Sequence, residues 1–247
     1  MGTLVAIEAR SPDRALAEYA VNVAFAVIHK VEFLLHPTRG RGDLARLNRS
    51  SPGQRLAVHP WTVGLLRISR ELCTRSGGVF EPALPGTGSI RHWLPAGRCA
   101  VVVRRRASVD FGGIAKGYAV DLAAAAMRHA GVRHGLINAG GDLCVFGDGP
   151  RPVTIRASGT ATALQALELW NCALAMSDPD CEQRPPEHRG YYQGGMGPRR
   201  RSAPAAAVIA PTAVLADALT KVLMFAPPAQ AARLLAHYGA RNARLNS

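Results

Sequence analysis

A glycine pair set between charged residues is the part of this sequence best suited to bind a phosphorylated ligand. It lies in the octet Asp110-Phe111-Gly112-Gly113-Ile114-Ala115-Lys116-Gly117, between a predicted strand end and a predicted helix start. Because glycine has no Cβ, the backbone can approach a phosphate closely here, and the free N–H groups at a helix start favour negative charge. Lys116 is a cation at that helix start, which is unfavourable unless an anion lies beside it. The octet therefore predicts an anion site; in a protein that binds nothing, Asp110 would only cap the helix.

The charge of the chain suits an anionic ligand without specifying it. Lysine and arginine number 30 against 17 aspartates and glutamates, which gives a formal net charge of +13. Such a charge is compatible with nucleic acid, an anionic membrane surface or a phosphorylated ligand. The tight arginine runs, residues 104–106 and 199–201, are not interleaved with aromatic residues that could stack on bases. We therefore expect no nucleic-acid partner. Only three lysines occur, Lys30, Lys116 and Lys221.

Cysteine usage and the start of the chain predict the compartment. The five cysteines are odd in number and form no CxxC pair, which argues against a disulfide framework or a zinc site. The first apolar stretch, residues 19–35, is interrupted by polar and charged side chains, so it matches neither a signal peptide nor a membrane span. We expect a cytoplasmic protein with no integral membrane segment; a leader upstream of Met1 would instead direct it to export.

The elements that must position the octet follow from periodicity and from Gly and Pro breaks. Helices are predicted from Ser11 and Pro12 to about Leu35, then over residues 60–76, 114–130, 213–225 and 228–238. Strands are predicted over residues 1–9, 99–103, 108–110, 134–146, 153–157, 166–170 and 206–210. Loops are predicted over residues 37–42, 81–95 and 179–201, the last of them long enough to act as a lid.

This order of elements predicts the fold class. Strands and helices are mixed without a regular alternation, and no repeat or low-complexity linker divides the chain. We therefore expect an α+β fold, with antiparallel sheets flanked by helices in a single domain over residues 1–247.

A longer string resembles a known family. The sequence DFGGIAKGYAVD over residues 110–121 and NAGGD over residues 138–142 resemble, in order and spacing, the signature of the ApbE family of flavin transferases. Further similar segments are the opening MGT, LARLN at residues 44–48, SGGVFE at residues 76–81 and ADAL at residues 216–219. Asn138 and Asp142 would otherwise be read as residues that shape a turn.

The resemblance implies a reaction and a set of ligands. Members of the family move FMN from FAD onto a Thr or Ser hydroxyl of an acceptor flavoprotein and release AMP, normally with Mg²⁺. For this chain the resemblance implies that FAD is contacted by Met1, Asp110, Gly112 and Lys116, and that residues 81–93 help to line the pocket. It further implies metal ligation by the Gly113 carbonyl and the Asp217 carboxylate.

Two segments depart from the family pattern. Four residues after Asp217, where the family has a threonine able to ligate the metal, this chain has Lys221. A protonated ammonium group cannot ligate Mg²⁺, and at this spacing it is expected to pair with the Asp217 carboxylate. The family's histidine-bearing segment is replaced by Gly194-Gly195-Met196-Gly197-Pro198-Arg199-Arg200-Arg201, with His188 as a possible substitute.

Three hypotheses follow from the sequence. The chain is a transferase in which Lys221 and residues 199–201 supply the charge that a metal otherwise would. Alternatively, it is a degenerate relative that binds FAD without transferring FMN. The third hypothesis is a basic binding or scaffold protein that keeps only the fold.

Overall fold

The computed structural model describes residues 3–38, 40–156, 164–178 and 205–243, and its centre is a six-stranded antiparallel sheet. The strand order is β1-β5-β6-β9-β10-β11. Their bounds are Val5–Arg10 for β1, His134–Ala139 for β5, Asp142–Phe146 for β6, Cys172–Ser177 for β9, Ala206–Ala210 for β10 and Arg241–Asn242 for β11. In β6 and β10 every residue is buried, because both faces of the sheet are covered at these strands.

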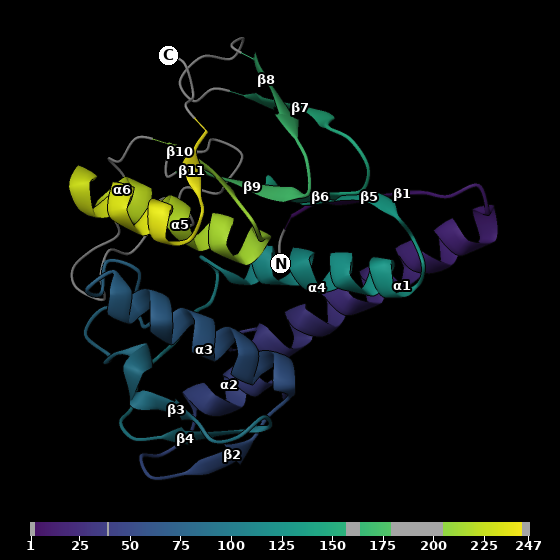
Figure 1. Cartoon of the computed structure of the whole chain (residues 1–247). Helices are drawn as coiled ribbons and strands as arrows, with labels where there is room; N and C mark the ends of the chain where they lie inside the picture. Colours follow the sequence, from purple (N-terminus) through teal and green to yellow (C-terminus); the bar gives the residue numbers. More distant parts are fainter. Residues whose placement is uncertain (1–2, 39, 157–163, 179–204, 244–247) are drawn as a thin grey trace.

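Helices cover one face of this sheet and a two-stranded ribbon covers the other (Figure 1). The helices are α1 (Arg14–Leu35), α4 (Ala115–His129) and α5 (Ala213–Phe225), followed by α6 (Pro228–His237). The ribbon pairs β7 (Arg151–Arg156) with β8 (Leu164–Leu169). A separate apolar cluster, which includes Leu143, Val145, Ile155 and Leu169, lies between the ribbon and the sheet.

A smaller lobe lies on the far side of the helices (Figure 1). It contains α2 (Asp43–Asn48), α3 (Pro60–Arg75), the short 3-10 helix η1 (Ile90–His92) and a sheet of order β2-β4-β3. These strands are β2 (Arg55–Ala57), β3 (Trp93–Pro95) and β4 (Ala100–Val103). One hydrophobic core runs continuously from this lobe into the space between the helices and the large sheet.

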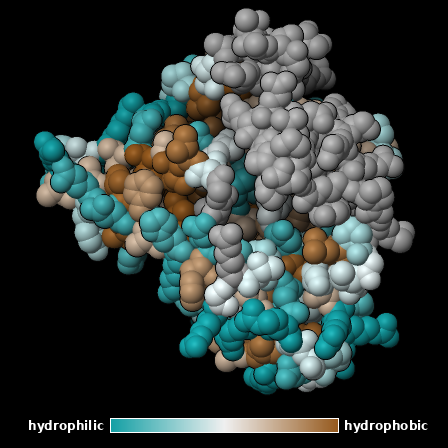
Figure 2. Space-filling model, turned by 180° about the vertical axis from the view of Figure 1, so that it is seen from behind, coloured by the Kyte–Doolittle hydropathy of each residue, from teal (hydrophilic) through white to brown (hydrophobic). Residues whose placement is uncertain are grey.

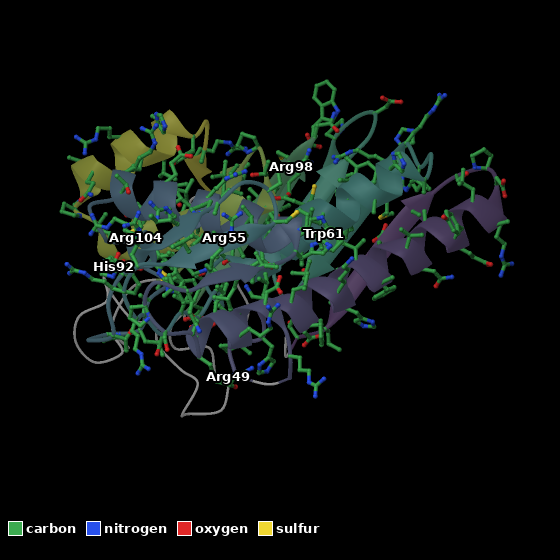
Figure 3. All side chains as sticks on the ribbon, turned by 90° about the horizontal axis from the view of Figure 1, so that it is seen from below. Arg49, Arg55, Trp61, His92, Arg98 and Arg104 are labelled. Carbon is green, nitrogen blue, oxygen red and sulfur yellow. The ribbon has the colours of Figure 1, made fainter. Side chains whose placement is uncertain are left out.

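Exposed arginines gather on the small lobe. Seen from below, Arg49, Arg55, Arg98 and Arg104 come from the small sheet and its connections (Figure 3). From behind, the lower part of the molecule is mainly hydrophilic (Figure 2). Part of the net positive charge therefore lies on side chains exposed to solvent. The absence of a nucleic-acid partner stays a prediction.

The predicted α+β class with antiparallel sheets flanked by helices is confirmed. Most predicted helices and strands are present within a few residues of their expected bounds. His59 caps α3 as its Nδ1 accepts a hydrogen bond from the Trp61 N–H at 3.2 Å, with Pro60 at the first helical position.

Several local predictions were wrong. The first helix begins at Arg14 instead of Pro12, because Asp13 is its cap: its Oδ1 accepts from the N–H groups of Ala15 and Leu16. The sequence prediction omitted α2, β2, β9 and β11, and residues 81–95, predicted as loop, contain η1 and β3. At residues 108–110 only Val109 forms a β-bridge, to Ala83. The predicted loop at residues 179–201 lies outside the described residues.

Asp121 joins α4 to the start of α5, a contact across more than ninety residues that the sequence motif did not reveal. Its two carboxylate oxygens accept from the N–H groups of Ala213 at 2.7 Å and Val214 at 2.8 Å. One turn earlier, a Cβ on Gly117 would lie 2.1 Å from the Ala213 carbonyl oxygen. Gly117 therefore lets the helices approach, and Asp121 satisfies backbone donors that α5 cannot pair internally.

Asp121→Ala should lower the free energy of unfolding by about 1 to 3 kcal/mol, because two backbone donors lose their acceptor. Urea denaturation measures the change. Asp148→Ala, which removes an exposed carboxylate, serves as the control and should change stability by less than about 0.5 kcal/mol. Equal losses in the two variants would contradict the capping role.

Candidate anion-binding site

The glycine turn predicted to bind an anion is held in place by the side chain of Asp110 and by two buried neighbours, Phe111 and Ile114. Asp110 Oδ1 accepts a hydrogen bond from the Gly112 N–H at 2.8 Å, while Phe111 and Ile114 are buried in the core. Asp110 and Gly112 are exposed, so both remain accessible to a ligand. The helix begins beyond them at Ala115, so Asp110 shapes the turn and is not the residue immediately before the helix.

Gly113 does not adopt an unusual backbone angle, because it is absent from the glycines with positive φ. A Cβ at this position would lie 3.3 Å from Cε of Lys221, tighter than ordinary van der Waals contact. The side chain of Lys221 therefore passes directly against the glycine turn. Gly113 and Asp217, the metal ligands implied by the resemblance, both contact Lys221, the residue that departs from the family pattern.

Behind the turn lies a cluster of two carboxylates and two ammonium groups, formed by Lys116, Asp142, Asp217 and Lys221. Lys116 Nζ pairs with Asp142 Oδ2 and lies 3.6 Å from Asp217 Oδ2. Lys221 Nζ donates to Asp217 Oδ1, and also to the Asp217 carbonyl oxygen at 2.9 Å. Asp217 Oδ2 further accepts from the Gly117 N–H at 3.2 Å. We call these four residues the charge cluster.

Three distant segments of the chain supply the cluster. Lys116 is in the first turn of α4, Asp142 opens β6, and Asp217 with Lys221 lies on one face of α5. The turn before Asp142 is fixed by Asn138, whose Oδ1 accepts from the Gly141 N–H at 2.9 Å. Asn138 therefore shapes the turn, as one interpretation of the sequence predicted. Asp142 is the anion that we expected beside Lys116.

Burial and charge act differently on the two carboxyl groups, both of which have fully buried side chains. Burial disfavours ionisation of Asp217, but the ammonium groups of Lys116 and Lys221 outweigh it and lower the pKa of this carboxyl. For Asp142, burial and the negative charge of Asp217 outweigh the lysines and raise its pKa. Asp142 Oδ1 is buried with no hydrogen-bond partner among the described residues. Asp217 is therefore the ionised centre of the cluster.

The groups present do not fit a Mg²⁺ ion. Mg²⁺ requires oxygen ligands in near-octahedral geometry, but both oxygens of Asp217 already accept hydrogen bonds, from Lys221 and from Gly117. The Thr220 hydroxyl does not replace the family's threonine, because it donates to the Asp217 carbonyl and shares a 2.7 Å bond with Ser177. In the described part of the chain no group of three or more His, Cys, Asp or Glu side chains could hold a metal.

Other predicted site residues are placed elsewhere or lie outside the described ranges. Trp93, in the segment predicted to line the pocket, is fully buried in the core. Met1, His188 and residues 194–201 lie outside the described residues, so their predicted roles stay predictions. Across residues 3–243, apart from the three gaps, no helix is long and apolar enough to cross a membrane.

Comparison with known proteins gives one family. The model of the ApbE family matches residues 1–93 and 88–244. A FAD:protein FMN transferase of Rhodobacter capsulatus is 32% identical over 183 residues, which is 61% of this chain and 34% of that relative. The chain thus aligns with about a third of the length of this relative.

Solved structures show the same fold. The apo form of the flavinyl transferase ApbE of Pseudomonas stutzeri has a TM-score of 0.79 at 22% identity, over 97% of this chain and 87% of the other. The flavin transferase ApbE of Vibrio cholerae has a TM-score of 0.79 at 17% identity, over 97% and 89%.

Asp217→Asn should lower the free energy of unfolding by about 3 to 5 kcal/mol at neutral pH, because it leaves the buried ammonium group of Lys221 without its counter-charge. Asp142→Asn is the matched isosteric variant and should cost less, because burial and the charge of Asp217 raise the pKa of Asp142, so that its ionised form contributes less than that of Asp217. Urea denaturation of both proteins, without FAD or added metal, measures the difference. An equal or larger loss for Asp142→Asn would refute this assignment of charge.

Proposed function

The chain belongs to the ApbE family, and we propose on that basis that it is a FAD:protein FMN transferase. In this proposal a Thr or Ser hydroxyl of an acceptor flavoprotein attacks the FMN phosphorus of FAD. The new oxygen–phosphorus bond forms as the bond to the AMP phosphate breaks, so that AMP leaves and the hydroxyl proton passes to the solvent. The named activity of the Rhodobacter capsulatus relative supports this reaction.

The observation that carries the proposal is the open glycine turn next to the ammonium group of Lys116. The pyrophosphate of FAD is an anion, and Lys116 in the first turn of α4 places an ammonium group beside the glycine turn. Exposed Asp110 and Gly112 border the same turn. We propose that these three residues contact FAD, as the resemblance implies for them.

The chain's own groups then have distinct tasks. Asp142 holds the ammonium group of Lys116 through an ion pair, which fixes its position before the ligand arrives. Asp217 accepts from Gly117 and so ties the start of α4 to α5. Such a fixed arrangement can stabilise charge on the pyrophosphate without rearranging during the reaction.

Purified protein incubated with FAD should release AMP, and adding a cell extract as a source of acceptors should produce protein bands that keep flavin fluorescence after denaturation. Lys116→Met should slow AMP release by about a hundredfold, the loss seen when one charge-stabilising donor is removed. AMP is measured by liquid chromatography.

Lys30→Met is the matched control, because Lys30 is an exposed lysine on α1, near Trp61. It should leave AMP release unchanged, and circular dichroism checks that both variants fold. Retained flavin with no AMP release would overturn the transferase proposal in favour of a protein that only binds FAD.

A further inference from the structure

The charge cluster contains a protein cation where the family resemblance implies a metal ion. Lys221 Nζ is held by two oxygens of Asp217, one from the carboxylate and one from the backbone. Its stem lies against Gly113, the residue whose carbonyl the resemblance assigns to the metal. The ammonium group therefore lies beside the residues expected to ligate a divalent ion and engages the same carboxylate.

The balance of charge in the cluster also leaves little attraction for a divalent cation. Asp217 and Asp142 carry two negative charges at most, while Lys116 and Lys221 carry two positive charges. With all four groups charged, the cluster has no net charge. A divalent cation entering it would meet two ammonium groups in a buried site, where repulsion is weakly screened.

Replacement of Lys221 by a residue with a side-chain oxygen would complete a set of oxygens suited to a cation. The Asp217 Oδ1 atom would lose its principal donor, and Asp142 Oδ1 is already buried without a partner among the described residues. A threonine at position 221 would add a hydroxyl oxygen on the same helix face, one turn after Asp217. A single substitution at position 221 would therefore turn the cluster into a site rich in oxygen ligands.

We propose that the Lys221 ammonium group is a permanent internal replacement for the divalent cation, so that the pyrophosphate site of this chain works without metal. The statement about pyrophosphate rests on the proposed function, because FAD is the ligand inferred there. The statement about the cation does not, because it concerns only Lys221, Asp217 and their neighbours.

Mn²⁺ binding without FAD tests the cation directly. Mn²⁺ accepts the same oxygen ligands as Mg²⁺, and electron paramagnetic resonance measures the free ion. The native chain should bind no Mn²⁺ at millimolar concentration, Lys221→Thr should bind about one ion, and Lys221→Met should bind none, since methionine removes the charge without adding an oxygen. One bound Mn²⁺ in the native chain would overturn the proposal, as would a folded Lys221→Thr protein that binds none.

FAD binding tests the consequence for the ligand, with flavin fluorescence as the readout in EDTA and in excess MgCl₂. The native chain should give the same Kd in both. Lys221→Met should bind FAD about tenfold more weakly in both, the loss expected for one charge-assisted contact. Lys221→Thr should bind weakly in EDTA and recover with MgCl₂. A native Kd that weakens about tenfold in EDTA would overturn the proposal.

The two tests separate the possible failures. If the native chain binds FAD in neither buffer, the proposed function fails, while the Mn²⁺ measurement still decides the role of Lys221. If circular dichroism shows that Lys221→Thr does not fold, Lys221→Gln takes its place, since its amide oxygen is also a metal ligand. Binding of one Mn²⁺ by Lys221→Gln supports the proposal, and its absence in the folded variant contradicts it.

Discussion

The fully buried carboxylate of Asp217 is the group around which the site is built. Burying such a charge is costly unless it is paired and hydrogen-bonded, and here Lys221, Lys116 and the Gly117 backbone meet that requirement from two helices. The same contacts bring the start of α4 against α5, which the missing side chain of Gly117 permits. Asp121, on α4, adds a second link between these helices, because its carboxylate accepts hydrogen bonds from the backbone at the start of α5. The position of the glycine turn therefore depends on electrostatic pairing as much as on the hydrophobic core beneath it.

Placing both ammonium groups inside the protein has a consequence for function. An exchangeable ion makes a binding site depend on the concentration of that ion, whereas a lysine side chain is always present and is oriented by folding. The cost is a fixed geometry, because an ammonium group donates hydrogen bonds but cannot act as a Lewis acid. In the proposed role of Lys221, the positive charge beside the turn comes from a side chain instead of an ion. Comparison with known proteins establishes the family.

Long elements with a strong period were predictable, and short elements were not. α3, α4 and α5 have helical spacing over several turns, so their presence follows from the sequence. By contrast, α2 has six residues and β2 has three, too few to show a period, and both are stabilised by tertiary contacts. The cap at Asp13 was missed because Ser11 and Pro12 form an equally good helix start by composition; the choice is made by which side chain reaches the N–H groups of Ala15 and Leu16.

The sequence by itself determined the α+β class, the family resemblance, the anion-suited glycine turn, and the pairing of Asp217 with Lys221. The last of these is predictable because residues four apart on a helix are neighbours whatever the fold. Only the tertiary structure decided that Asp142 is the partner of Lys116, that Asp121 caps α5, and that Lys221 passes against Gly113. These contacts join segments separated by 26 to more than 100 residues, and periodicity carries no information about which distant backbones meet. They are fixed by how the helices pack on the sheet.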